Sequence, residues 1–421
     1  MVRISNEKLL TLLAGLSSIY LYFSGLGQYF QVVAYLKYIV YPLCYLFGIV
    51  AYIRTFKIKR NFIIFWAFVL IVLMNFALNV NFSKYAIITT SADTVLLSDI
   101  MLLLFISIPG YFLSMEDLKT EVLLSDFTRM GVLVCSLFTV YYVLVVFIYR
   151  IAFDYMNITY GVLPWLLFVL AFSFHNKKKL FLVLSIVDVV LILISGCRGA
   201  ALTTLVFLFL VILWYIKDNF DYRKLLLVFV LLSGLIVVVL NFDTIMMSAY
   251  TSLSALGFKS RSLELYLGLG YEQGLGHYND RAAFQTVMID NINLFGHGLY
   301  SDRSIAAPGV YAHNVILEWL IDFGIIFGTP LVIFFLYITI KNLFLLFRTN
   351  SHSTMVMIAM CISILCCKYM FSSSYLHAPE FWIVFGIYIS IQENSLKEKD
   401  NNTILLDSKK VMDSREYGRI L

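Results

Sequence analysis

The chain has 421 residues, of which 61% are hydrophobic and only 14% are charged, and its formal net charge is +5. Soluble globular chains are about 45–50% apolar and about 25% charged, so this composition excludes a soluble enzyme and indicates a protein largely surrounded by lipid. Because the net charge is small, its distribution is more informative than its sum, and we expect no nucleic-acid partner.

Twelve stretches of the chain are apolar enough to form membrane-spanning helices of about 20 residues each. In chain order they lie near 9–27, 31–53, 61–80, 96–113, 129–149, 160–174, 180–196, 199–216, 225–241, 314–340, 354–372 and 379–392. We therefore predict an all-α, polytopic membrane protein with about twelve transmembrane helices and one long external loop.

Lysine and arginine set the predicted orientation, because they are enriched in cytoplasmic loops. With the N-terminus inside, 22 of the 31 basic residues fall in cytoplasmic loops or in the two tails. Both termini are therefore expected in the cytoplasm. This topology divides the chain into helices one to nine (1–241), an external cap (242–313), helices ten to twelve (314–393) and a cytoplasmic tail (394–421).

The cap segment is far less apolar than its surroundings and contains several glycines. Within it, residues 281–292 carry apolar side chains at helical spacing, namely Phe284, Val287, Met288 and Ile292. The cap holds four basic and six acidic residues, so it is no general basic patch. Anion binding there would depend on individual arginines, such as Arg281 at the start of this helix. Arg303 could take part in this way, or it could be an ordinary solvated surface residue.

Arg198 is the first residue that the topology leaves without an explanation. It lies in Ser195-Gly196-Cys197-Arg198-Gly199, between two apolar runs, where the predicted topology places it at the external face. An arginine there could extend its side chain to water at the interface. It could equally bind an anion, because a guanidinium group matches phosphate oxygens in a bidentate manner.

A second group of polar residues stands where the cap returns to the membrane. His313 and Asn314 precede the tenth span, and Glu318 and Asp322 follow within it, four residues apart on one helix face. An imidazole at this boundary could act as a general base or hydrogen-bond a phosphate, or it could be an ordinary interfacial histidine. Because carboxylates are costly in lipid, we expect Glu318 and Asp322 to face protein or water.

These features together resemble the bacterial O-antigen polymerase and O-antigen ligase superfamily. The resemblance covers roughly residues 190–390. It rests on the motif at 195–199, on Arg281 followed by Leu294-Phe295-Gly296-His297-Gly298, on His313-Asn314 followed by Gly324, and on Ser372-Ser373-Ser374 and Phe381-Trp382.

The resemblance implies a membrane glycosyltransferase of the GT-C type in the bacterial inner membrane. Its donor would be a glycan linked to undecaprenyl pyrophosphate, and a chain-length regulator is a further possible partner. Carried over to this sequence, Arg198 and Arg281 would bind the pyrophosphate and His313 would assist transfer, with Arg303, Asn314 and Glu318 in support. No Asp-x-Asp-like pair flanks the loop helix, so we expect no metal and no cofactor.

Three functions compete at this point. The first is a polymerase that joins polysaccharide repeat units of O-antigen or capsule, and the second is the ligase that moves finished glycan onto lipid A-core to form lipopolysaccharide. The third is a polysaccharide flippase or transporter, for which we would expect internal repeats and ion-site residues near the membrane midplane. The sequence shows no clear repeat, and its polar residues gather at one external face instead, which disfavours the transporter. The motifs hardly separate polymerase from ligase, and the polymerase is the leading hypothesis.

Overall fold

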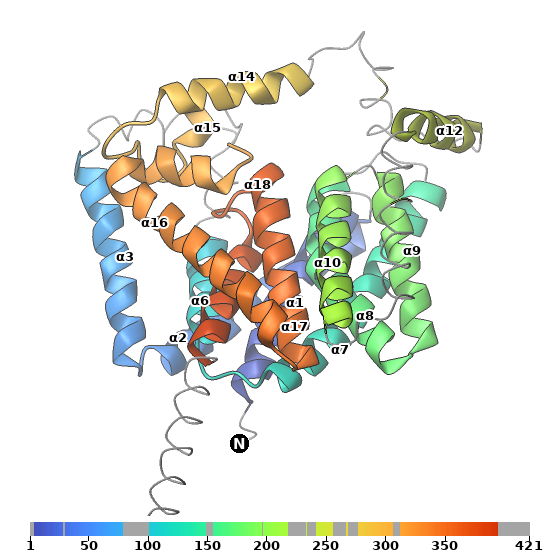
Figure 1. Ribbon diagram of the computed structural model, residues 1–421, viewed down its shortest axis with the longest axis horizontal. Coiled ribbons are helices and arrows are strands. Elements are labelled where there is room, and N and C mark those ends of the chain that lie inside the picture. The colour runs from blue at the N-terminus through green and yellow to red at the C-terminus, as the bar shows by residue number, and fades with distance from the viewer. Residues whose placement is uncertain are drawn as a thin grey trace, which may run out of the picture.

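The computed structural model describes residues 4–27, 30–78, 101–148, 155–195, 197–217, 233, 241–255, 267, 277–305 and 312–394. Every regular element within these ranges is a helix (Figure 1). The prediction of an all-α, polytopic membrane protein is therefore confirmed. The predicted cytoplasmic tail, 394–421, lies almost entirely outside the described residues.

The helices follow the predicted spans closely. In chain order they are α1 (Asn6–Gly27), α2 (Gln31–Thr55), α3 (Lys59–Leu78), the π-helix η1 (Leu103–Ser107) with α6 (Ile108–Ser114), α7 (Thr120–Tyr142) with η2 (Val143–Ile148), α8 (Tyr155–Asn176), α9 (Lys179–Ser195), α10 (Arg198–Lys217), α12 (Phe242–Ala255), α14 (His277–Asp290), α15 (Asp302–Ile305), α16 (Val315–Arg348), α17 (His352–Ser363) with η4 (Ile364–Lys368) and α18 (Tyr369–Phe371), and a last helix over 379–394.

Helices stand at eleven of the twelve predicted spans, and the ninth, 225–241, falls almost entirely outside the described residues. Within the described ranges, six helices are long and apolar enough to cross a bilayer, judged by length and composition alone. A total of twelve therefore stays a prediction.

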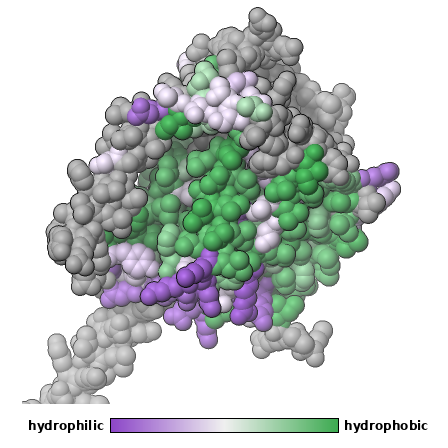
Figure 2. All heavy atoms as spheres, turned by 90° about the vertical axis from the view of Figure 1, so that its right-hand side faces the viewer, coloured by the Kyte–Doolittle hydropathy of each residue, from purple (hydrophilic) through white to green (hydrophobic). Residues whose placement is uncertain are grey.

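Helix α9 shows how the bundle meets lipid. Leu180, Val183 and Ile186 are 77%, 58% and 51% exposed, whereas Ser185 and Asp188 on the opposite face are buried. This is the reverse of a soluble amphipathic helix, and it fits an environment in which lipid covers the apolar face. The view onto this side of the molecule shows a continuous apolar band, with hydrophilic side chains gathered below it (Figure 2).

Asp188 is a charged residue deep within the seventh predicted span, 180–196. It is fully buried, and the Thr139 hydroxyl on α7 donates a hydrogen bond of 2.6 Å to its Oδ1 atom. A polar group in a low-dielectric interior needs such a partner. A charge at such a position marks either a polar cavity or a structural pair, and this contact favours the structural pair.

The loops and the N-terminal segment whose lysines and arginines predict a cytoplasmic location meet at one end of the bundle. We call this the N-terminal end. Contacts between segments far apart in the sequence establish this: the Arg54 guanidinium donates to the Ile4 carbonyl (2.7 Å), the Lys119 N–H donates to Glu7 (3.1 Å), and Lys217 donates to the Thr349 carbonyl. Helices α14 and α15 lie at the opposite end, which we call the cap end (Figure 1).

Helix α16, predicted as a single span, is broken near the cap end at Gly324, where the backbone has φ 71° and ψ −176°. Residues 293–298 dock against the break through four backbone hydrogen bonds of 2.8–3.0 Å, which run from His297 to Ile321, from Gly298 to Asp322, from Ile325 to Asn293 and from Ile326 to Leu294. A helix break at a membrane boundary leaves N–H and carbonyl groups unsatisfied. The loop supplies the missing partners.

The same docking brings two glycines of the sequence motifs into contact. Gly296 also has a positive φ (78°), and a Cβ atom on either Gly296 or Gly324 would collide with the backbone of the other segment. Only glycine adopts the Gly324 conformation without strain.

We predict that Gly324→Ala lowers the free energy of unfolding by at least about 2–3 kcal/mol, because it combines a strained backbone with a backbone collision. Thermal melting of the detergent-purified protein measures the loss. Gly15→Ala is the matched control, because Gly15 is helical and its added Cβ would meet only the flexible end of the Met130 side chain. Equal melting temperatures for the two variants would contradict the role given to the break.

Candidate functional site

The start of α16 carries the polar residues that mark the cap end. Asn314 is the N-cap residue, and its Oδ1 atom accepts hydrogen bonds from the N–H groups of Ile316 (3.0 Å) and Leu317 (3.1 Å). His313, directly before it, is half-buried and has a positive φ of 55°. A non-glycine residue with positive φ is uncommon, and such conformations concentrate at functional sites.

Glu318 and Asp322, on the first turns of α16, are both fully buried. They hold the segment that connects α18 to the last helix: the Ser374 hydroxyl and the Tyr375 N–H (3.2 Å) donate to Glu318, and the Tyr375 hydroxyl donates to Asp322 Oδ2 (2.7 Å). The expectation that these carboxylates face protein is confirmed. Because every contact is to another segment, the pair fixes the loops around it.

Asp302 and Arg303, on the short helix α15, complete this group of charges. Ser301 donates to Asp322 Oδ1 (3.2 Å), which ties α15 to α16, and the Ala312 N–H donates to Asp302 Oδ2 (2.9 Å). Arg303 lies with its guanidinium carbon 4.8 Å from the centre of the Tyr300 ring. Its positive charge interacts with Asp302, Glu318 and Asp322.

This cluster places three acidic groups around one arginine. Burial raises the pKa of the Asp302 carboxyl above its ordinary value, and the charge of Arg303 and the Ala312 N–H only partly offset this rise. Among the described residues, no three His, Cys, Asp or Glu side chains are arranged to hold a metal ion. The contacts of this cluster are hydrogen bonds and charge interactions with neighbouring segments.

The turn that carries Arg198 also lies at the cap end. Helix α10 begins at Arg198, and its other end, Lys217, is bonded to Thr349 at the N-terminal end. The Tyr160 hydroxyl from α8 occupies the space that a Cβ on Gly199 would fill. The side chain of Arg198 lies outside the described part of the structure, so the structure locates this residue by its backbone.

Helix α14, which carries Arg281, packs on the start of α16 through a small apolar cluster of Met288, Ala312, Leu317 and Ile321, with Ile292 and Ile305 beside it. Met288 and Ile292 thus lie on the predicted apolar face, whereas Val287 is 39% exposed, so its assignment to that face was wrong. The helix also begins earlier than predicted, at His277. The side chain of Arg281 lies outside the described residues.

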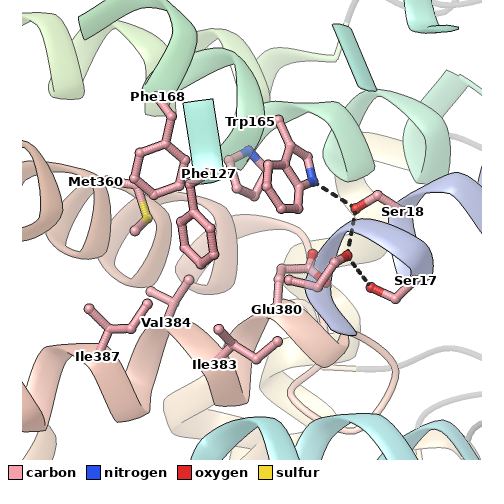
Figure 3. Close-up of a pocket in the computed structure, with 12 residues that line it drawn as sticks. Ser17, Ser18, Phe127, Trp165, Phe168, Met360, Glu380, Ile383, Val384 and Ile387 are labelled. Atoms are coloured by element: carbon pink, nitrogen blue, oxygen red, sulfur yellow. Dashed lines mark hydrogen bonds between the residues drawn. The ribbon is translucent and has the colours of Figure 1, made fainter. Parts of the chain in front are cut away.

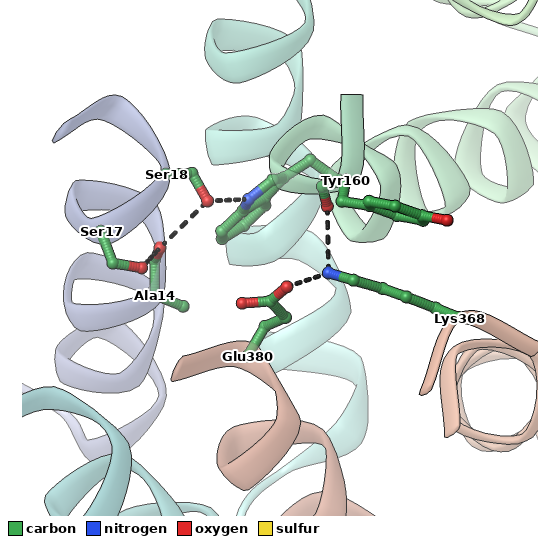
Figure 4. Close-up of polar contacts among 7 residues, drawn as sticks. Ala14, Ser17, Ser18, Tyr160, Lys368 and Glu380 are labelled. Carbon is green, nitrogen blue, oxygen red and sulfur yellow. Dashed lines mark hydrogen bonds and ion pairs between the residues drawn. The ribbon is translucent and has the colours of Figure 1, made fainter. Parts of the chain in front are cut away.

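One cluster of polar residues at the cap end was not predicted from the sequence. Lys368, a charged residue within the predicted span 354–372, forms an ion pair with Glu380 at the start of the last helix (Figure 4). Glu380 also lines a cavity of about 30 Å³, large enough for a water molecule, beside Ser17 and Ser18 of α1 and Trp165 of α8 (Figure 3). The signals available in the sequence were a lysine within a predicted span and an acidic residue at a span boundary.

We predict that the pH dependence of stability will identify Asp302. Its folded pKa is raised, so the folded state binds more protons than the unfolded state above about pH 4, and stability decreases as the pH rises through this window. Asp302→Asn removes the titration and retains an acceptor for the Ala312 N–H. Its melting temperature should therefore fall less than that of the wild type between about pH 4 and about pH 8. Parallel curves for the two proteins would contradict this role.

Comparison with known proteins identifies a family to which part of this chain is similar. Residues 180–335 match a family model described as O-antigen ligase, which confirms the resemblance to the O-antigen polymerase and ligase superfamily. Members of this family are membrane glycosyltransferase-like enzymes. The matched residues include Arg198, Arg281, His313 and Gly324, and they end before Lys368 and Glu380. No curated protein and no solved structure matches the chain.

Proposed function

We propose that this chain, a member of the O-antigen polymerase and ligase superfamily through residues 180–335, is a polysaccharide repeat-unit polymerase of the bacterial inner membrane. It would transfer a growing glycan from undecaprenyl pyrophosphate onto the sugar of a second lipid-linked repeat unit. The N-terminal end and both termini would be cytoplasmic. The cap end, with residues 242–313, would face the periplasm.

The observation that carries this proposal is the meeting of separate sequence motifs at one end of the bundle. The glycine turn at 294–298 and the break at Gly324 are joined by backbone hydrogen bonds, and α14 packs on the same part of α16. The α10 turn lies at this end as well. This arrangement supports a site built by residues from three distant parts of the chain.

Glycosyl transfer requires two chemical aids at such a site. The acceptor hydroxyl attacks the anomeric carbon and loses a proton, while the bond from that carbon to the pyrophosphate oxygen breaks. Positive groups must meet the charge that develops on the leaving pyrophosphate. In the proposed mechanism Arg198 and Arg281 bind the pyrophosphate and His313 assists the proton transfer, whereas Arg303, Asn314 and Glu318 support them.

We predict that Arg198→Ala and Arg281→Ala each reduce the formation of long polymer by about 10²-fold, because each removes a group that stabilises the leaving pyrophosphate. The measurement is the length distribution of glycan in a complemented deletion strain, together with the amount of protein in the membrane. Arg60→Ala is the matched control, since Arg60 is paired with Glu393 at the N-terminal end. Unchanged glycan ladders in both arginine variants would refute their proposed roles.

The ligase remains a second candidate, and the description of the matching family model favours it. It would use the same donor and the same leaving group but transfer finished glycan to lipid A-core. A deletion strain distinguishes the two functions. Loss of the polymerase should leave lipopolysaccharide with a single repeat unit, whereas loss of the ligase should leave lipid A-core without glycan.

A further inference from the structure

An ion pair between a buried lysine and a half-buried glutamate joins the last two membrane helices at the cap end, outside the residues that match the family. The Lys368 side chain is 1% exposed and the Glu380 side chain is 26% exposed. Burying the lysine charge and part of its partner costs desolvation energy, and a pair of apolar side chains would often be equally stable or more stable. Stability alone therefore does not explain the pair.

Lys368 also holds a third element, α8. Its Nζ atom donates to the Tyr160 carbonyl at 3.4 Å and lies 5.1 Å from the centre of the Tyr160 ring (Figure 4). A cation over an aromatic face is attracted by the ring, and the attraction is stronger where water is excluded. Glu380 fixes the ammonium group, and the ammonium group in turn fixes the main chain and the ring of Tyr160.

Tyr160 passes this constraint to α10. Its hydroxyl lies against Gly199, in space that any larger residue at this position would occupy. Its neighbour Thr159 lies within 3.5 Å of Ser195, oxygen to oxygen, on the other side of the same turn. The first turn of α10, which begins at Arg198, is therefore held by α8, and α8 is held by the ion pair.

We propose that Lys368 and Glu380 are positioning residues for Arg198: through Tyr160 they fix the first turn of α10 so that the Arg198 guanidinium meets the pyrophosphate of the donor. The inference rests on the proposed function, because Arg198 has this role only if the chain transfers a pyrophosphate-linked glycan. It adds a pair from the last two membrane helices to the residues on which donor binding depends. The need for an exact turn geometry explains why a charged pair with a buried lysine stands at this position.

The principal test is the double variant Lys368→Met/Glu380→Leu, which removes both charges and leaves neither one buried alone. We expect it to melt like the wild type. Its KM for the lipid-linked donor should rise roughly 10- to 100-fold, as expected for a misplaced binding group. Amide hydrogen exchange in residues 199–204 should become faster, because the first turn of α10 has lost its support.

Two further variants keep the test decisive. Glu380→Gln retains the shape of the side chain and should show the same changes more weakly, and it can be measured if the double variant does not fold. Arg60→Met/Glu393→Leu removes the ion pair at the N-terminal end, where the side chains are 45% and 35% exposed, and should leave both exchange and KM unchanged.

The outcomes separate this inference from the proposed function. Wild-type exchange in residues 199–204 of a folded double variant, or of Glu380→Gln, would overturn the positioning role. A double variant with normal melting and a normal donor KM would overturn it as well. If the wild-type protein transfers no glycan, the proposed function fails, and the exchange measurement still decides whether the pair fixes the α10 turn.

Discussion

The four backbone hydrogen bonds between residues 293–298 and the break in α16 are the constraint on which the cap end depends. A membrane helix that stops being helical exposes carbonyl and N–H groups where water is scarce. Here the loop satisfies both sides of the break at once. Helix α14 precedes the loop in sequence and residues 301–303 follow it, so the positions of both over α16 depend on this docking.

The cap end also contains several buried charged groups. Glu318 and Asp322 are fully buried, and hydrogen bonds from residues 301, 374 and 375 satisfy them. Lys368 is paired with Glu380 and contacts Tyr160. Because lipid cannot solvate a charge, each buried ionic group must be matched by protein groups from other segments. These contacts join α16, within the family-matched region, and α8, which precedes that region, to residues 368–380.

Several features could be predicted from the sequence because they follow from local composition. Eleven of the twelve predicted spans coincide with helices, and the basic segments gather at one end as their positions relative to the spans imply. The burial of Glu318 and Asp322 followed from the cost of a carboxylate in lipid. Their partners at 374 and 375 did not, because about fifty residues of chain separate them.

Other features were missed for similar reasons. The break at Gly324 could not be distinguished from an ordinary helical glycine, since its conformation depends on the loop that docks there. Val287 fits the helical spacing of its neighbours, yet the packing of α14 on α16 leaves it exposed. Glu380 stands at a span boundary, where an acidic residue is unremarkable until Lys368 is seen beside it.

By itself, the sequence determined that this is an all-α, multi-pass membrane protein, and its motifs indicated the superfamily. These properties depend on runs of apolar residues and on short motifs, which are local in the chain. Only the tertiary structure decided which polar groups share one site and which residues support the α10 turn. Those relations join segments far apart in sequence, and they are set by the need to satisfy each buried polar group where neither water nor lipid can do so.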